Sequence, residues 1–141
     1  MSLDIFTDGS WRHSIPEYSG WAYIVIAEGS IIDQNSGVIE CLSRQIDGEL
    51  FATLAALYAI EHIINKYKVI NLYYDYIGNE AWANGKWKAN SVVSKEYIHE
   101  ISLIPYMDKV RWIKVKSHSG CEGNDIVDAL AKKALDSLEA R

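Results

Sequence analysis

The sequence predicts an α/β fold in which five strands form one mixed sheet and helices pack on its faces. Three observations predict it. The amino-terminal third contains runs rich in β-branched and aromatic residues, which are typical of paired strands. Two later apolar runs each follow a helical pattern, and a strand after a helix indicates a parallel crossover. The length of 141 residues suits one domain, 1–141, with its own core.

The first three strands are expected before residue 43. Residues 3–8 and 20–28 are separated by a polar segment that contains proline, which indicates a strand pair. Residues 31–42 predict a third strand, and the turn-forming residues at 35–37 predict a turn or bulge within it.

A long helix is expected next, because the apolar residues then recur at spacings of three and four. Asp47 is a candidate N-cap for this helix, since its carboxylate can accept a hydrogen bond from the first turn. The residues predicted to share one helical face are Leu50, Leu54, Leu57, Ile60 and Ile64.

The second half of the chain alternates strand and helix patterns. Pro105 ends one of the helical segments. The expected elements are a strand at 68–76, helices at 79–86 and 94–104, a strand at 110–116 and a helix at 124–138. No internal repeat or linker interrupts this order, so a single compact unit is expected.

Composition narrows the function classes. The hydrophobic share of 49% is that of a globular protein, and no apolar run is long enough to span a membrane. The amino end lacks the pattern of a signal peptide, so a cytoplasmic location with reduced thiols at Cys41 and Cys121 is expected. The net charge of −5 argues mildly against a protein that holds nucleic acid by bulk electrostatics.

Four acids in apolar surroundings are the strongest indication of function: Asp8, Glu49, Asp75 and Asp128. Such acids are costly to desolvate unless a positive charge offsets them. Asp8 is expected at the end of the first strand, where Gly9 would let the chain turn, and Asp75 at the end of the fourth. Glu49 and Asp128 are expected near helix starts, where anionic groups are tolerated. A divalent cation with a preference for hard oxygen ligands, Mg²⁺ or Mn²⁺, would offset their repulsion.

Each acid taken alone has an ordinary explanation, because turns and helix caps use acidic residues routinely. The order of the four acids and their places on the predicted elements favour a common site. The motifs that contain them are TDGS, GELFATLAAL, YYDY and VKSHSGCEGNDIVDALAKKA, and GWAYIVI lies in the second strand. With these motifs, the chain resembles a type 1 ribonuclease H over nearly its whole length.

The resemblance implies a five-stranded mixed sheet, three strands antiparallel and then two parallel, with helices on both faces. It implies that Asp8, Glu49, Asp75 and Asp128 are both catalytic and metal-binding, with Asp8 bridging two Mg²⁺ ions that Mn²⁺ can replace. It also makes His118 the catalytic histidine of a loop. The implied reaction is hydrolysis of the RNA strand of an RNA–DNA hybrid, by a monomer without a separate hybrid-binding domain. The implied substrate contacts are Gly9, Ser10, Gln45, Asn79, Trp87 and Lys88.

Several alternatives stay open at this point. His118 can be a solvated loop residue, although zinc bound by His118 and Cys121 fails for want of further ligands. Trp82 can be a core residue instead of part of the aromatic and basic segment that handles DNA. Tyr76 departs from the small polar residue that often follows the third acid. The chain can also be a DNA-cutting nuclease of the same fold, a non-catalytic tethering module, or a domain of a reverse transcriptase polyprotein.

Overall fold

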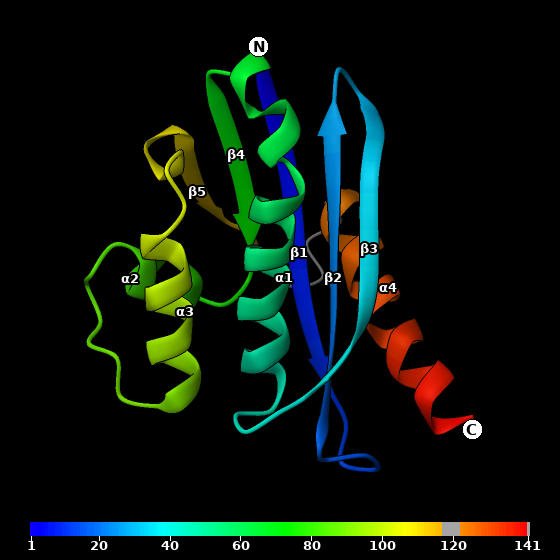
Figure 1. Ribbon diagram of the computed structural model, residues 1–141. Helices are drawn as coiled ribbons and strands as arrows, with labels where there is room; N and C mark the ends of the chain where they lie inside the picture. The colour runs from blue at the N-terminus through cyan, green and yellow to red at the C-terminus, as the bar shows by residue number, and fades with distance from the viewer. Residues whose placement is uncertain (117–121, 141) are drawn as a thin grey trace.

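The computed structural model describes residues 1–116 and 122–140. Its five strands form one sheet in the order β3-β2-β1-β4-β5 (Figure 1). Strand β2 runs antiparallel to both β1 and β3, whereas β4 runs parallel to β1 and β5 parallel to β4, which confirms the predicted mixed sheet. The bounds are β1 Ser2–Trp11, β2 Tyr18–Ala27, β3 Ser30–Glu40, β4 Val69–Tyr74 and β5 Val110–Lys114.

Helices cover both faces of this sheet. In Figure 1, α1 and α3 lie in front of the strands and α4 crosses behind them. The bounds are α1 Gln45–Ala59, α2 Gly78–Ala83, α3 Val92–Ser102 and α4 Glu122–Glu139, with 3₁₀ turns η1 Glu61–Lys66 and η2 Met107–Lys109. Helix α3 begins with a reciprocal cap between Ser91 and Ser94, in which each hydroxyl accepts the other residue's backbone N–H.

The alternation of β2 divides the core into two layers, because successive side chains of a strand point to opposite faces. Tyr23 and Val25 pack with the apolar face of α1. Ala22 and Ile24 pack with Val127 and Ala131 of α4. Both faces of the central strands are therefore buried.

Strand β1 does not end at Asp8, as the sequence suggested, but continues to Trp11. Asp8 pairs with Ala22 and Gly9 with Trp21 in the antiparallel ladder. Gly9 does not form a turn; it leaves room for the backbone of α1. A Cβ atom there would lie 2.4 Å from the backbone nitrogen of Glu49, so only glycine lets α1 approach this closely.

The start of α1 also differs from the prediction. Arg44, with a φ of 56°, is the N-cap residue, and its side chain makes no cap hydrogen bond. Asp47 lies inside the first turn, where its carboxylate accepts the backbone N–H groups of Leu42 and Ser43 at 3.1 and 2.7 Å. Asp47 thus holds the incoming loop against the helix instead of capping it.

Two further boundaries shift. Strand β3 continues through residues 35–37 without a turn, and the register irregularity lies farther toward its start, opposite Val25 and Ile26. The apolar pattern that runs to Ile64 is shared by α1, which ends at Ala59, and the 3₁₀ turn η1. A 3₁₀ turn places residues three apart on one side, so spacing alone did not separate the two.

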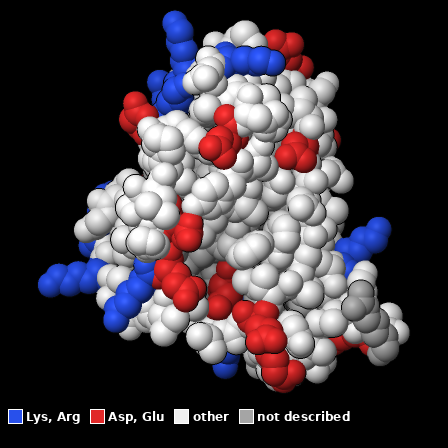
Figure 2. Space-filling view, in the orientation of Figure 1, with Lys and Arg blue, Asp and Glu red and all other residues white. Residues whose placement is uncertain are grey.

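Charge is distributed unevenly over the surface. In the face that Figure 2 shows, lysine and arginine side chains project at the margins, whereas acidic side chains lie across its middle and lower parts. Among the described residues, no helix is both long and apolar enough to cross a membrane.

Candidate active site

The parallel pairing of β1 and β4 brings Asp8 and Asp75 to the same edge. The last pair of this ladder joins Phe6 to Tyr73, and each acid lies two residues farther along the chain, Asp8 within β1 and Asp75 just after the end of β4. The carboxyl ends of parallel strands therefore meet where both acids lie, as the sequence predicted.

Helix α1 adds Glu49 from the front of the sheet. The backbone N–H of Gly9 donates to Oδ1 of Asp8 at 2.9 Å and to Oε1 of Glu49 at 3.1 Å. Carboxylate oxygens of Asp8, Glu49 and Asp75 all lie within 4.8 Å of one another. Three acids from β1, α1 and the end of β4 thus converge on one small volume.

Helix α4 adds Asp128 from behind the sheet. Asp128 lies close enough to Asp8 to raise the pKa of that carboxyl group. Its own Oδ2 accepts a hydrogen bond from Nζ of Lys132 at 3.0 Å, one helical turn farther on. The fold therefore brings the four predicted acids together from four different elements.

Keeping these buried carboxylates charged is energetically unfavourable unless a cation is bound. Burial, together with the neighbouring Asp128, raises the pKa of Asp8 to about 6. Burial and the Asp8 charge raise the pKa of Glu49 well above its usual range. Oε2 of Glu49 is buried and has no hydrogen-bond partner among the described residues. An all-oxygen site with repelling carboxylates and an unpartnered oxygen fits Mg²⁺ or Mn²⁺.

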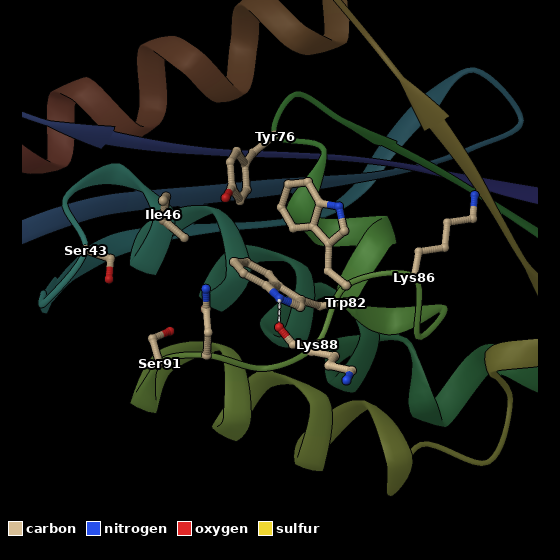
Figure 3. Close-up of a pocket in the computed structure, with 9 residues that line it drawn as sticks. Ser43, Ile46, Tyr76, Trp82, Lys86, Lys88 and Ser91 are labelled. Atoms are coloured by element: carbon tan, nitrogen blue, oxygen red, sulfur yellow. Dashed lines mark hydrogen bonds between the residues drawn. The ribbon is translucent and has the colours of Figure 1, made fainter.

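An open pocket of about 520 Å³ lies between the start of α1 and the α2–α3 connection (Figure 3). Three aromatic rings form its wall: Trp87 meets Trp82 edge to face at 5.3 Å between ring centroids, and both contact Tyr76. Lys86 and Lys88 extend from one end, and the opposite side is formed by Ser43 and Ile46.

Trp82 is both a core residue and part of the pocket wall. Its side chain is buried, with its indole N–H donating to the Lys88 carbonyl at 3.3 Å, and it also lines the pocket. Trp87 is 40% exposed, so it presents its ring to solvent. The charge of Glu49 contributes to the raised pKa of Tyr76, after burial, which shows that the pocket adjoins the acid cluster.

The other predicted residues are placed differently. Gly9 and Ser10 follow Asp8 on β1, and Gln45 is exposed at the start of α1. Asn79 has no exposed surface, and its amide is turned toward α1, so its predicted substrate contact stays a prediction. His118 lies outside the described residues.

Sequence reasoning missed two buried hydroxyl residues beside the acids. Ser19 of β2 and Thr53 of α1 both bond to the first turns of α1. Ser19 lies outside the quoted motifs, and Thr53 lies within GELFATLAAL without a spacing that marks it as functional. Ser19 lies 29 residues from its partner Gly48, and only the tertiary packing brings the two together.

Known proteins share both this sequence pattern and this fold. The family model described as RNase H matches residues 1–136. A ribonuclease H from Neorickettsia sennetsu is 31% identical, and the alignment covers 95% of this chain and 93% of that protein. The crystal structure of RNase H1 from Halobacterium salinarum superimposes with a TM-score of 0.79, at 22% identity, over 97% of this chain and 99% of that one. LC11-RNase H1, solved in complex with an RNA/DNA hybrid, gives a TM-score of 0.73 at 19% identity, over 94% and 99% of the two chains. The chain therefore belongs to the ribonuclease H family.

Proposed function

We propose that this ribonuclease H hydrolyses the RNA strand of RNA–DNA hybrids and leaves a 5′-phosphate and a 3′-hydroxyl. The observation that carries the proposal is the convergence of Asp8, Glu49 and Asp75, with oxygens within 4.8 Å of one another, beside Asp128. Membership of the family supports it, and so does the hybrid bound in the structure of LC11-RNase H1.

The four acids would hold two Mg²⁺ ions, with Mn²⁺ as a substitute. The chemistry that these ions would supply there is activation of a water molecule for attack on the scissile phosphate and stabilisation of the leaving 3′-oxygen. Asp8 would be the ligand shared by the two ions, because its carboxylate has an oxygen within 4.8 Å of one of Asp75 and also adjoins Asp128. In the hydrolysis, a P–O bond to water forms and the P–O3′ bond breaks.

Residues around the acids would position the hybrid. The unpartnered Oε2 of Glu49 is available to a ribose hydroxyl or a metal ion, and Gly9, Ser10 and Gln45 lie at the same edge. Contacts with 2′-hydroxyls are what separate RNA from DNA. The aromatic pocket, with Trp87 and Lys88, is suited to the DNA strand, since a ring can stack on a sugar or base and an ammonium group can bind a phosphate.

We assign His118 a role in proton transfer or product release. An imidazole changes charge near neutral pH, and the residue precedes Asp128 by ten positions. His118→Ala is expected to slow turnover roughly a hundredfold while leaving hybrid binding intact.

Cleavage of matched duplexes tests the proposal. Labelled RNA–DNA, RNA–RNA and DNA–DNA duplexes are incubated with Mg²⁺, with Mn²⁺ or with a chelator. We expect metal-dependent cutting confined to the RNA of the hybrid, with 3′-hydroxyl ends. Binding without cutting would favour the tethering module, and cutting of the DNA duplex would favour a DNA nuclease of this fold.

A further inference from the structure

Ser19 joins the backbone two residues after Asp8 to the backbone immediately before Glu49. Its hydroxyl donates to the carbonyl of Ser10 at 3.2 Å and accepts the N–H of Gly48 at 3.0 Å. Ser19 is completely buried, so water does not compete for these bonds. One hydroxyl therefore fixes the separation between β1 just after Asp8 and α1 just before Glu49.

Thr53 and Asn79 hold the other side of the Glu49 peptide unit. The Thr53 hydroxyl donates to the Glu49 carbonyl at 3.1 Å and accepts the Asn79 amide at 2.7 Å. The backbone carbonyl of Asn79 in turn accepts the Tyr97 hydroxyl at 2.7 Å, which ties α2 to α3. Thr53, Asn79 and Tyr97 are all buried.

The first turn of α1 needs such external bonds. Its N-cap residue, Arg44, supplies no side-chain hydrogen bond, and helix starts otherwise leave N–H groups without partners. A Cβ atom on Gly48 would lie 2.2 Å from the Gly20 carbonyl oxygen, so α1 lies directly against β2 here. Small movements of this turn would move Glu49 relative to Asp8.

We infer that Ser19, Thr53 and Asn79 are positioning residues that set the distance between Glu49 and Asp8 and thereby the affinity of the site for divalent metal. The inference rests on the proposed function, because it assumes that the acids bind metal. It gives buried Asn79 a task for which direct substrate contact is unnecessary. Partners that orient metal ligands are typically worth 10- to 100-fold in metal affinity.

Isothermal titration with Mn²⁺, without substrate, tests this inference on the full chain. Ser19→Ala and Thr53→Val remove one hydroxyl each at nearly constant volume. We expect each to raise the Mn²⁺ dissociation constant roughly tenfold. Thr53→Ser keeps the hydroxyl and is expected to bind Mn²⁺ like the wild type.

Thr7→Val is the matched control. Thr7 is also completely buried, but its hydroxyl has no hydrogen-bond partner among the described residues. Its loss is expected to leave Mn²⁺ affinity unchanged. Thermal melting of every variant without metal shows separately whether the protein is folded at the titration temperature.

The outcomes separate positioning from simple support of the fold. Weaker Mn²⁺ binding by folded Ser19→Ala and Thr53→Val, with restored binding by Thr53→Ser, would support the inference. In cleavage assays these two variants should then need more Mn²⁺ but recover wild-type kcat at saturation. Lower melting temperatures with unchanged Mn²⁺ affinity would overturn it. A wild-type protein that neither binds Mn²⁺ nor cleaves a hybrid would instead refute the proposed function.

Discussion

Asp8 and Glu49 share one backbone donor, the N–H of Gly9, and burial is the main reason that both have raised pKa values. A site that served stability alone would gain by replacing one of them with a neutral residue. Their retention at 6% and 3% exposure indicates a function that needs negative charge there.

The substitution Asp8→Asn separates the requirement of stability from the requirement of negative charge for function. The amide keeps the shape of the carboxylate but removes its charge, so RNA cleavage should fall by roughly a thousandfold or more at saturating Mg²⁺. The metal-free protein should melt roughly 3 °C higher at pH 7, because the repulsion with Glu49 and Asp128 is gone. Calorimetry and cleavage of the same preparation check both results, and wild-type turnover by this variant would contradict the assignment.

The raised pKa of Asp8 determines whether the metal-free protein gains or loses stability as the pH rises. Its folded pKa of about 6 exceeds its ordinary value of 3.8, so the folded state binds more protons between these values. The metal-free protein should therefore lose stability as the pH rises through this interval. The stabilisation produced by Mg²⁺ should increase from pH 5 to pH 7, because metal and protons compete for the same oxygens. Melting curves with and without Mg²⁺ check this, and a metal effect that is constant over this range would refute it.

At the level of elements, the position of α1 decides whether the site forms. The apolar spacing predicted α1, and the pairing of β1 with β4 explains why Asp8 and Asp75 meet. The close approach of α1 to Gly9 could not be predicted, because an Asp-Gly pair reads as a turn when only neighbours in sequence are considered.

Gly9→Ala tests that close approach. The added methyl group would meet the backbone of α1 at 2.4 Å, which side-chain movement cannot relieve. We expect a loss of roughly 1–3 kcal/mol in the free energy of unfolding and a large loss of cleavage. Gly29→Asn is the control, since a Cβ atom at Gly29 meets nothing within 4 Å and asparagine tolerates its positive φ. Equal effects of the two substitutions in denaturant titrations would contradict the account.

The α2–α3 connection should contribute to the affinity for the hybrid and not to the rate of cleavage. Trp87→Ala removes the exposed ring of the pocket, and we expect hybrid affinity to fall roughly tenfold with kcat nearly unchanged. Leu103→Ala, equally a change of an exposed apolar residue, is the control because Leu103 does not line the pocket. Fluorescence anisotropy with a labelled hybrid in Ca²⁺ measures the affinity, and a drop in kcat alone would argue against this role.

For the whole molecule, the sequence was most informative where local patterns coincide with the fold. The succession of strands and helices along the chain followed from periodicity, because alternation and burial are local features of the sequence. The arrangement of the sheet and the shared role of the four acids were implied by the resemblance that the motifs carry. The bonds of Ser19 and Asn79 depend on contacts between elements far apart in sequence. The sequence therefore indicated no role for Ser19, and for Asn79 it indicated a substrate contact instead of a hydrogen bond to Thr53.

The net charge of −5 adds a prediction at this scale. Basic side chains lie at the margins of the face in Figure 2, so few phosphates are neutralised at once. We expect hybrid affinity to fall with salt with a slope that corresponds to roughly two to four phosphate contacts. Anisotropy titrations at several KCl concentrations measure the slope, and a much steeper dependence would reveal a basic surface elsewhere.

Anomalous scattering from a crystal soaked in Mn²⁺, with a hybrid bound to a slowly cleaving variant such as His118→Ala, tests the central claim most directly. We expect two manganese peaks between the carboxylates of Asp8, Glu49, Asp75 and Asp128, next to a phosphate of the RNA strand. Manganese bound elsewhere, or no manganese among these acids while the hybrid is in place, would contradict it.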